Sequence, residues 1–248
     1  IKEVGLPIQV IFCDTFNESP DTYRYVDYIS GLLQEWGHPP IIRLAGEYTF
    51  FSLAEKKQRF PSIKARFCTE MLKVVPKLRW IQDQEFEKDP VVVLGIRRDE
   101  SVNRSDRQEW EFSCKVYDEI IWNPILNWSA KDVFAIHKRY GVEINPMYRM
   151  GFKRVGCFPC INCGRNELIL MDKHYPGRIE EIARWEKELG EKQKKMMPYS
   201  YLPPRRKGVV WNIHDHVRWA KKDAKNARQG LLFPKATLCS YAELGVCE

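Results

Sequence analysis

Short apolar runs alternate with amphipathic segments along the first part of the chain. Residues 8–13 and 91–96 are apolar without strict alternation, which is typical of strands buried on both faces of a parallel sheet. Residues 40–44 and 119–122 are two further strand candidates, and a helix is predicted from Pro20 to Gly37. Strands that alternate with helices in this way predict an α/β fold, with a parallel sheet flanked by helices.

Helical patterns dominate the rest of the chain. Ser129 and Asp132 have the spacing of a helix N-cap with a carboxylate three residues later. Residues 178–195 and 211–227 are predicted to form two charged amphipathic helices. We therefore expect residues 1–170 to form a nucleotide-binding α/β domain and residues 171–248 a helical C-terminal appendage.

Charge and cysteine content narrow the class of ligand. The formal net charge is +7, from 40 Lys and Arg against 33 Asp and Glu, which suits a nucleotide or a nucleic acid, although a solvated basic surface gives the same balance. The chain has no apolar run near the roughly 18 residues of a membrane span, and it does not begin with a secretory leader. We expect a cytoplasmic protein without a membrane partner, in which eight cysteines favour metal or redox chemistry.

Cys157, Cys160 and Cys163 place three thiols within seven residues. Repeated Cys-x-x-Cys spacing is typical of sites that hold zinc or an iron–sulfur cluster. The fourth ligand has three candidates, which are Cys68, Cys239 and Cys247, and the spacing alone does not decide the metal.

Polar residues follow two of the predicted strands. Asp14 and Thr15 come directly after the first strand, and Arg97 and Arg98 follow the strand at residues 91–96. Ligands of parallel sheets bind beyond the carboxyl ends of the strands, so these residues are expected to face one crevice.

Four segments, in order along the chain, resemble the phosphoadenylyl-sulfate and adenylyl-sulfate reductase family of the adenine nucleotide alpha-hydrolase-like superfamily. They are Arg-Phe-Cys-Thr-Glu-Met-Leu-Lys-Val-Val-Pro at 66–76, Gly-Ile-Arg-Arg-Asp-Glu-Ser at 95–101, Pro-Ile-Leu-Asn-Trp-Ser-Ala-Lys-Asp-Val at 124–133, and Gly-Phe-Lys-Arg-Val-Gly-Cys-Phe-Pro-Cys at 151–160. The resemblance implies reduction of an adenylyl sulfate (APS or PAPS) with release of sulfite, supported by a thiol reductant.

The resemblance also implies a cofactor. Adenylyl-sulfate reductases hold a 4Fe–4S cluster on two adjacent cysteines and a later Cys-x-x-Cys pair. Cys68 matches the first of the adjacent pair, Thr69 replaces the second, and Cys163 restores the count. The implied ligands are Cys68, Cys157, Cys160 and Cys163, with zinc as the alternative metal.

The cations of the similar segments are the predicted oxyanion ligands. Guanidinium groups bind phosphate or sulfate at two points, and a lysine binds as a point charge. We expect this role for Lys73, Arg97, Arg98 and Arg104, and we expect Lys153 and Arg154 to draw the anion toward the thiols.

The chain departs from the reductase pattern at two places. The family's Gly-rich phosphate loop is not found, and we expect it to lie upstream of Ile1 in a longer protein. The family's C-terminal Glu-Cys-Gly-x-His element is also missing, which leaves Cys247 as a stand-in catalytic nucleophile.

A sibling family gives the main alternative. DNA phosphorothioation sulfurtransferases share an Arg-Phe-Cys-Thr-like segment and an iron–sulfur site, and they use ATP to activate a nucleic acid. This alternative implies Mg²⁺ with ATP, where Asp14 and Thr15 are the candidate ligands, together with a cysteine desulfurase as partner. A non-catalytic module that binds a nucleotide or a nucleic acid is the third hypothesis.

Overall fold

A computed structural model describes residues 7–86, 88–114, 117–192, 199–203 and 211–229. The chain forms two compact units. The larger unit consists of residues 1–81 and 145–248, and the smaller unit consists of residues 82–144.

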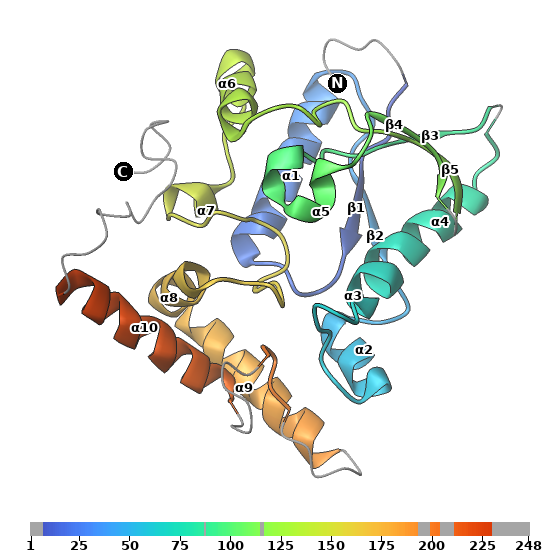
Figure 1. The fold of residues 1–248 in the computed structure, drawn as a ribbon. Helices are drawn as coiled ribbons and strands as arrows, with labels where there is room; N and C mark the ends of the chain where they lie inside the picture. The colour runs from blue at the N-terminus through green and yellow to red at the C-terminus, as the bar shows by residue number, and fades with distance from the viewer. Residues whose placement is uncertain (1–6, 87, 115–116, 193–198, 204–210, 230–248) are drawn as a thin grey trace. The chain divides into compact units, whose positions relative to one another are not determined.

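The larger unit begins with a strand–helix–strand segment. Strand β1 (Ile11–Asp14) pairs in parallel with β2 (Ile42–Ala45), and helix α1 (Pro20–Glu35) connects them (Figure 1). Ser19 caps α1 by accepting a hydrogen bond from the Thr22 N–H, and Pro20 occupies the first turn, where no intrahelical N–H is needed. The parallel pair with its connecting helix confirms the predicted α/β class.

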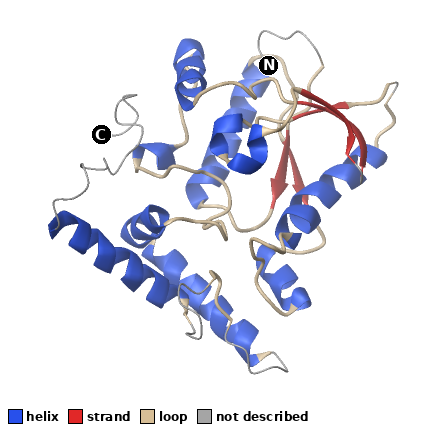
Figure 2. Ribbon diagram, in the orientation of Figure 1, coloured by secondary structure: helices blue, strands red, loops and turns tan. Residues whose placement is uncertain are grey.

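Helices form most of the remaining larger unit (Figure 2). They are α2 (Phe50–Lys57), α3 (Phe67–Thr69), a π-helical turn η1 (Glu70–Val74), α4 (Val75–Gln82), α7 (Pro146–Arg149), α8 (Arg165–His174), α9 (Pro176–Glu191) and α10 (Ile213–Gln229). Helices α8, α9 and α10 pack against one another (Figure 1). Within the described ranges, no helix is both long and apolar enough to cross a membrane.

A single apolar core runs through the larger unit. It joins side chains of α2 and η1 to the loop at residues 157–163 and to α8, α9 and α10, as in Phe50, Leu72, Phe158 and Ile182. Residues on both sides of position 170 therefore contribute to one core. The proposed division into residues 1–170 and 171–248 stays a prediction.

The smaller unit contains a three-stranded sheet. Strand β5 (Tyr117–Trp122) lies between β3 (Val91–Val93), its parallel neighbour, and β4 (Trp110–Cys114), its antiparallel neighbour. A 3-10 turn η2 (Arg98–Glu100), α5 (Val102–Ser105) and α6 (Ala130–Tyr140) complete the unit. Helix α6 begins at the predicted cap, since Ser129 and Asp132 form a reciprocal capping box.

Candidate functional site

The loop after β1 is organised by a buried carboxylate. Glu18 accepts hydrogen bonds from the Thr15 hydroxyl at 2.7 Å and from the backbone N–H groups of Thr15 and Asn17 at 3.3 and 3.1 Å. The Tyr23 hydroxyl donates to both Glu18 and Asp14. Burial, reinforced by these two carboxylates, raises the pKa of Tyr23 and keeps its hydroxyl protonated.

Asp14 and Thr15, both predicted to bind nucleotide, contribute to this loop. Asp14 accepts a hydrogen bond from the Phe16 N–H at 2.8 Å, and Thr15 is buried. Phe16 has a positive φ of 56°, which turns the backbone sharply at the strand end. Their role toward a ligand stays a prediction.

The cysteine-bearing loop, residues 157–163, meets this strand-end loop. Glu18 and Cys157 form an antiparallel bridge, and the Phe158 N–H donates to the Asn17 carbonyl at 2.5 Å. Segments separated by some 140 residues in sequence are thus fixed side by side in the larger unit.

Lys73 places a cation beside the first thiol of the loop. Its Nζ lies 3.6 Å from the Cys157 Sγ, and its carbonyl accepts a hydrogen bond from the Cys13 thiol at 3.3 Å. Burial lowers the pKa of Lys73, but Cys157 and Glu18 raise it more, so the net shift is upward. Burial raises the pKa of Cys157, and the charge of Lys73 opposes that rise. The site therefore combines a protonated amine with a shielded thiol.

Cys68 and Cys160 share the electrostatic surroundings of Cys157, and Cys163 lines a small cleft together with Cys157 and Cys160. Burial raises the pKa of Cys68, hydrogen bonds from Thr69 lower it, and Cys160 adds a smaller upward shift. Cys157 likewise interacts electrostatically with Cys160 and Cys68. Cys163 is buried in the core, and its backbone N–H donates to the Cys160 carbonyl.

These thiols do not form a ready metal site. Among the described residues, no group of three or more His, Cys, Asp or Glu side chains is placed to hold a metal ion. The cluster, the zinc alternative and the set Cys68, Cys157, Cys160 and Cys163 stay predictions. Cys239 and Cys247 lie outside the described residues.

Lys153 and Arg154 precede the cysteine-bearing loop and are exposed. Arg154 lines a small cleft together with Cys157, Cys160 and Glu167. Burial raises the pKa of Glu167, whereas the Gly164 N–H, Arg154 and Lys153 oppose the rise. Both cations are thus positioned near a carboxylate, and their role toward an anion stays a prediction.

The predicted arginine ligands lie in the smaller unit, where they have local partners. Arg97 pairs with Asp99 at 3.0 Å and with Glu100 at 3.5 Å, and Arg104 also pairs with Glu100. Arg98 donates to the backbone carbonyl of Arg107 at 2.9 Å. Whether these arginines and the loop at Asp14 share one crevice stays a prediction.

Comparison with known proteins decides the family. The profile described as the phosphoadenosine phosphosulfate reductase domain matches residues 1–163. The chain belongs to this family. The matched region contains both the strand-end loop and the cysteine-bearing loop as far as Cys163.

The relatives differ in how much of their own length this chain covers. An uncharacterized 37.8 kDa protein of Escherichia phage 186 is 28% identical over 99% of this chain and 91% of its own length. An adenosine 5'-phosphosulfate reductase of Anoxybacillus flavithermus is 27% identical over 64% of this chain, and the chain spans 65% of that reductase. A crystal structure of phosphoadenylyl-sulfate reductase from Candida auris is 21% identical with a TM-score of 0.48, covering 63% of this chain and 72% of its own.

Several residues of the site were not predicted from the sequence. Asn17 and Glu18 follow a strand end, and that position is the one signal that could have suggested them. Arg178 and Tyr201 lie beyond the family match yet contact the cysteine-bearing loop at the Phe158 and Pro159 carbonyls. No local pattern around them indicates that contact.

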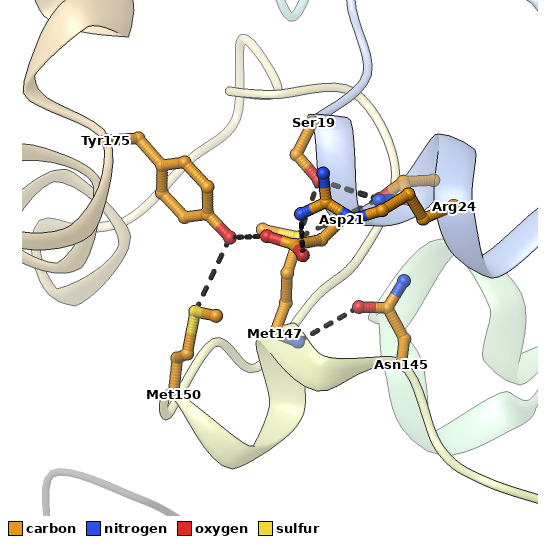
Figure 3. A network of polar contacts seen from close by, with 8 residues as sticks. Ser19, Asp21, Arg24, Asn145, Met147, Met150 and Tyr175 are labelled. Carbon is orange, nitrogen blue, oxygen red and sulfur yellow. Dashed lines mark hydrogen bonds and ion pairs between the residues drawn. The ribbon is translucent and has the colours of Figure 1, made fainter.

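A second polar network in the larger unit lies around Asp21 (Figure 3). Asp21 accepts hydrogen bonds from the Tyr175 hydroxyl and from Arg24, and the Tyr175 hydroxyl also lies 3.4 Å from the Met150 sulfur. The network joins α1 to α7 and to the start of α9.

Proposed function

We propose that this protein is an enzyme of the sulfonucleotide-reductase type, which acts on an adenylyl sulfate and releases sulfite. The family match over residues 1–163 supports the class of substrate. The observation that carries the proposal is the pairing of Lys73 with Cys157, because a fixed cation beside a thiol suits an anionic sulfonate.

The proposed reaction proceeds in two thiol steps. A thiolate attacks the sulfonate sulfur, so that a sulfur–sulfur bond forms while the sulfur–oxygen bond to the adenosine phosphate breaks. A thiol reductant then attacks the enzyme sulfur, which releases sulfite and leaves a disulfide. The two thiols supply the two electrons that reduce the transferred sulfur. Cys247 is the proposed nucleophile, because it stands in for the catalytic cysteine of the family's C-terminal Glu-Cys-Gly-x-His element.

Charge stabilisation in this reaction falls to the basic residues. The leaving adenosine phosphate gains negative charge, which positioned cations stabilise. Lys73 is the proposed cation of the larger unit, with Lys153 and Arg154 at the approach to the thiols. Arg97, Arg98 and Arg104 are the proposed oxyanion ligands of the smaller unit.

A 4Fe–4S cluster on Cys68, Cys157, Cys160 and Cys163 remains part of the proposal. The shared electrostatic neighbourhood of the first three supports it, whereas the arrangement of the described side chains does not yet fit a metal ion. For that reason no step above uses the cluster. Anaerobic purification tests it, with iron and acid-labile sulfide expected in the protein and zinc as the contrary result.

The second candidate function is ATP-dependent sulfur transfer to a nucleic acid. It is favoured by Thr69, which follows Cys68 and hydrogen-bonds to it where adenylyl-sulfate reductases have a second cysteine. This reaction would use Mg²⁺ with ATP near Asp14 and Thr15, and a cysteine desulfurase as sulfur donor. Its product besides the thiolated acceptor would be pyrophosphate.

One pair of assays separates the candidates. The protein is incubated with APS or PAPS and a dithiol reductant, and sulfite is measured. In parallel it is incubated with ATP, Mg²⁺ and DNA, and pyrophosphate is measured. We expect sulfite release that depends on the enzyme. Pyrophosphate without sulfite would select sulfur transfer. If neither product forms, the non-catalytic nucleotide-binding module is the hypothesis that remains. Equilibrium binding of labelled APS tests that hypothesis.

We also propose that the enzyme is cytoplasmic. The cysteines whose side chains the structure describes are Cys13, Cys68, Cys157, Cys160 and Cys163, and all of them are free thiols. Clustered free thiols are maintained in reducing compartments.

A further inference from the structure

Three side chains outside the cysteine-bearing loop hold its backbone in place. The Arg178 Nε donates to the Phe158 carbonyl at 2.7 Å, and the Tyr201 hydroxyl donates to the Pro159 carbonyl at 2.7 Å. Asn17 links the two donors, because its amide nitrogen donates to the Tyr201 hydroxyl at 3.1 Å and its amide oxygen accepts from Arg178. We name Asn17, Arg178 and Tyr201 the loop clamp.

The clamp acts on the segment between the thiols. Phe158 and Pro159 are the two residues that separate Cys157 from Cys160, and both of their carbonyls are held. The Phe158 N–H is held as well, by the Asn17 carbonyl. A tight turn fixed at three consecutive backbone groups leaves the flanking sulfurs little freedom to move.

Arg178 and Tyr201 are themselves fixed by other residues of the larger unit. The Arg178 guanidinium lies over the Trp185 ring at 4.6 Å and pairs with Glu181. Tyr201 is 1% exposed, and its ring packs on Phe50 and Phe60. The clamp is therefore anchored in the aromatic core rather than in solvent.

Buried Glu186 extends this anchoring to α10. Its two carboxylate oxygens accept hydrogen bonds from the Tyr201 N–H at 2.7 Å and the Ile213 N–H at 2.9 Å. The start of α10 and the Tyr201 backbone are thus tied to the same carboxylate of α9. The chain beyond the family match supports the thiol turn through this route.

We infer that Arg178 and Tyr201 are positioning residues, which hold the Cys157–Cys160 turn so that the Cys157 sulfur meets Lys73. This inference deepens the proposed function, on which it rests for the importance of the thiols. The position of the clamp itself is independent of substrate. Contact with the loop backbone, rather than with a sulfur, is what distinguishes positioning from catalysis here.

The test measures thiol accessibility in the reduced, metal-free chain of residues 1–248. Wild type, Tyr201→Phe and Arg178→Ala are alkylated with iodoacetamide, and the rates at Cys157 and Cys160 are read by peptide mass spectrometry. Tyr201→Phe keeps the buried ring and removes one loop hydrogen bond, so we expect about fivefold faster alkylation at both thiols. Arg178→Ala is expected to have the larger effect, and Arg178→Lys to recover part of it because one donor returns.

Tyr175→Phe is the matched control. It also removes a hydroxyl that hydrogen-bonds within the larger unit, but that hydroxyl contacts Asp21 and Met150 (Figure 3). We expect its Cys157 and Cys160 rates to match wild type. Equal acceleration in Tyr175→Phe and Tyr201→Phe would overturn the inference in favour of general loosening, as would an unchanged rate in Tyr201→Phe. Because no substrate is added, either result is independent of sulfite release.

Discussion

The two units of the molecule use charge in different ways. The larger unit keeps Glu18 and Glu186 inside, each satisfied by backbone N–H donors, and it holds Lys73 against a thiol. In the smaller unit, Arg97, Arg104 and Arg107 pair with carboxylates at most four residues away, as in the Arg97–Asp99, Arg104–Glu100 and Arg107–Glu111 pairs.

Substitutions of charged residues should therefore have different effects in the two units. A buried charge depends on partners that the whole fold supplies, so its removal leaves a desolvated group unpaired. An ion pair near the surface is weak and readily exchanged. Charge removal should therefore cost much in the larger unit and little in the smaller one.

The largest effect is expected at Lys73. Lys73→Met keeps the apolar stem and removes the cation beside Cys157, so sulfite release should fall about a hundredfold in kcat/KM. Lys57→Met is the control, because Lys57 is exposed in the last turn of α2. Retention of more than half the activity by a folded Lys73→Met protein would remove Lys73 from the proposed site.

Glu186 should give the next largest effect, as a pH dependence of stability. Burial raises its pKa from 4.5 to about 7, although the Tyr201 and Ile213 N–H groups oppose the rise, and Asp215 adds to it. The unfolded chain loses this proton near pH 4.5 and the folded chain near pH 7. The stabilisation from the retained proton is thus complete below pH 4.5 and is lost as pH rises to 7.

The pH dependence of Glu186 is measured by urea unfolding between pH 4.5 and 8. The shift corresponds to roughly 3 kcal/mol in the free energy of unfolding. Glu186→Gln stays neutral at every pH, like the protonated wild-type side chain, and should therefore lack this slope. Glu188→Gln changes an exposed residue of the same helix and should keep the slope. Parallel profiles for the wild type and Glu186→Gln would contradict the assignment.

Local partners were readable from the sequence, whereas distant ones were not. The Ser129–Asp132 box and the start of α1 at Pro20 are fixed by neighbours within one helical turn, so their patterns sufficed. Arg178 meets Asn17 across 161 positions and Lys73 meets Cys157 across 84, and such pairings arise only when the chain folds.

The strands show the same limit of sequence patterns. Strand β4 was not predicted, because Trp110 and Phe112 alternate with polar residues over too few positions to distinguish a strand from a loop. Its antiparallel pairing with β5 is likewise a non-local outcome. The Cys-x-x-Cys spacing indicated the clustered cysteines, and the resemblance indicated Lys73, but the contact between Lys73 and Cys157 is seen only in the fold.

Removing a helix cap should cost the same stability in both units, unlike removing a buried charge. Ser129 caps α6 in the smaller unit and Thr49 caps α2 in the larger one, each in a reciprocal capping box near the surface. Ser129→Ala and Thr49→Ala should each cost about 1 kcal/mol, measured by hydrogen exchange of the capped helix. A cost several times larger for Thr49→Ala would mean that the units differ in more than their buried charges.

The smallest effect is expected on anion affinity, when the carboxylates that pair with Arg97 are removed. If Arg97 binds an oxyanion, it must first leave Asp99 and Glu100, and these carboxylates compete with the ligand. An Asp99→Asn, Glu100→Gln double variant should bind sulfate or APS about fivefold more tightly by calorimetry, and Arg97→Ala should bind more weakly. Glu111→Gln releases Arg107 in the same way and is the control. Equal gains in both variants would indicate a general change of charge. A gain confined to the Asp99 and Glu100 variant assigns the anion to Arg97 and Arg104, which both pair with Glu100.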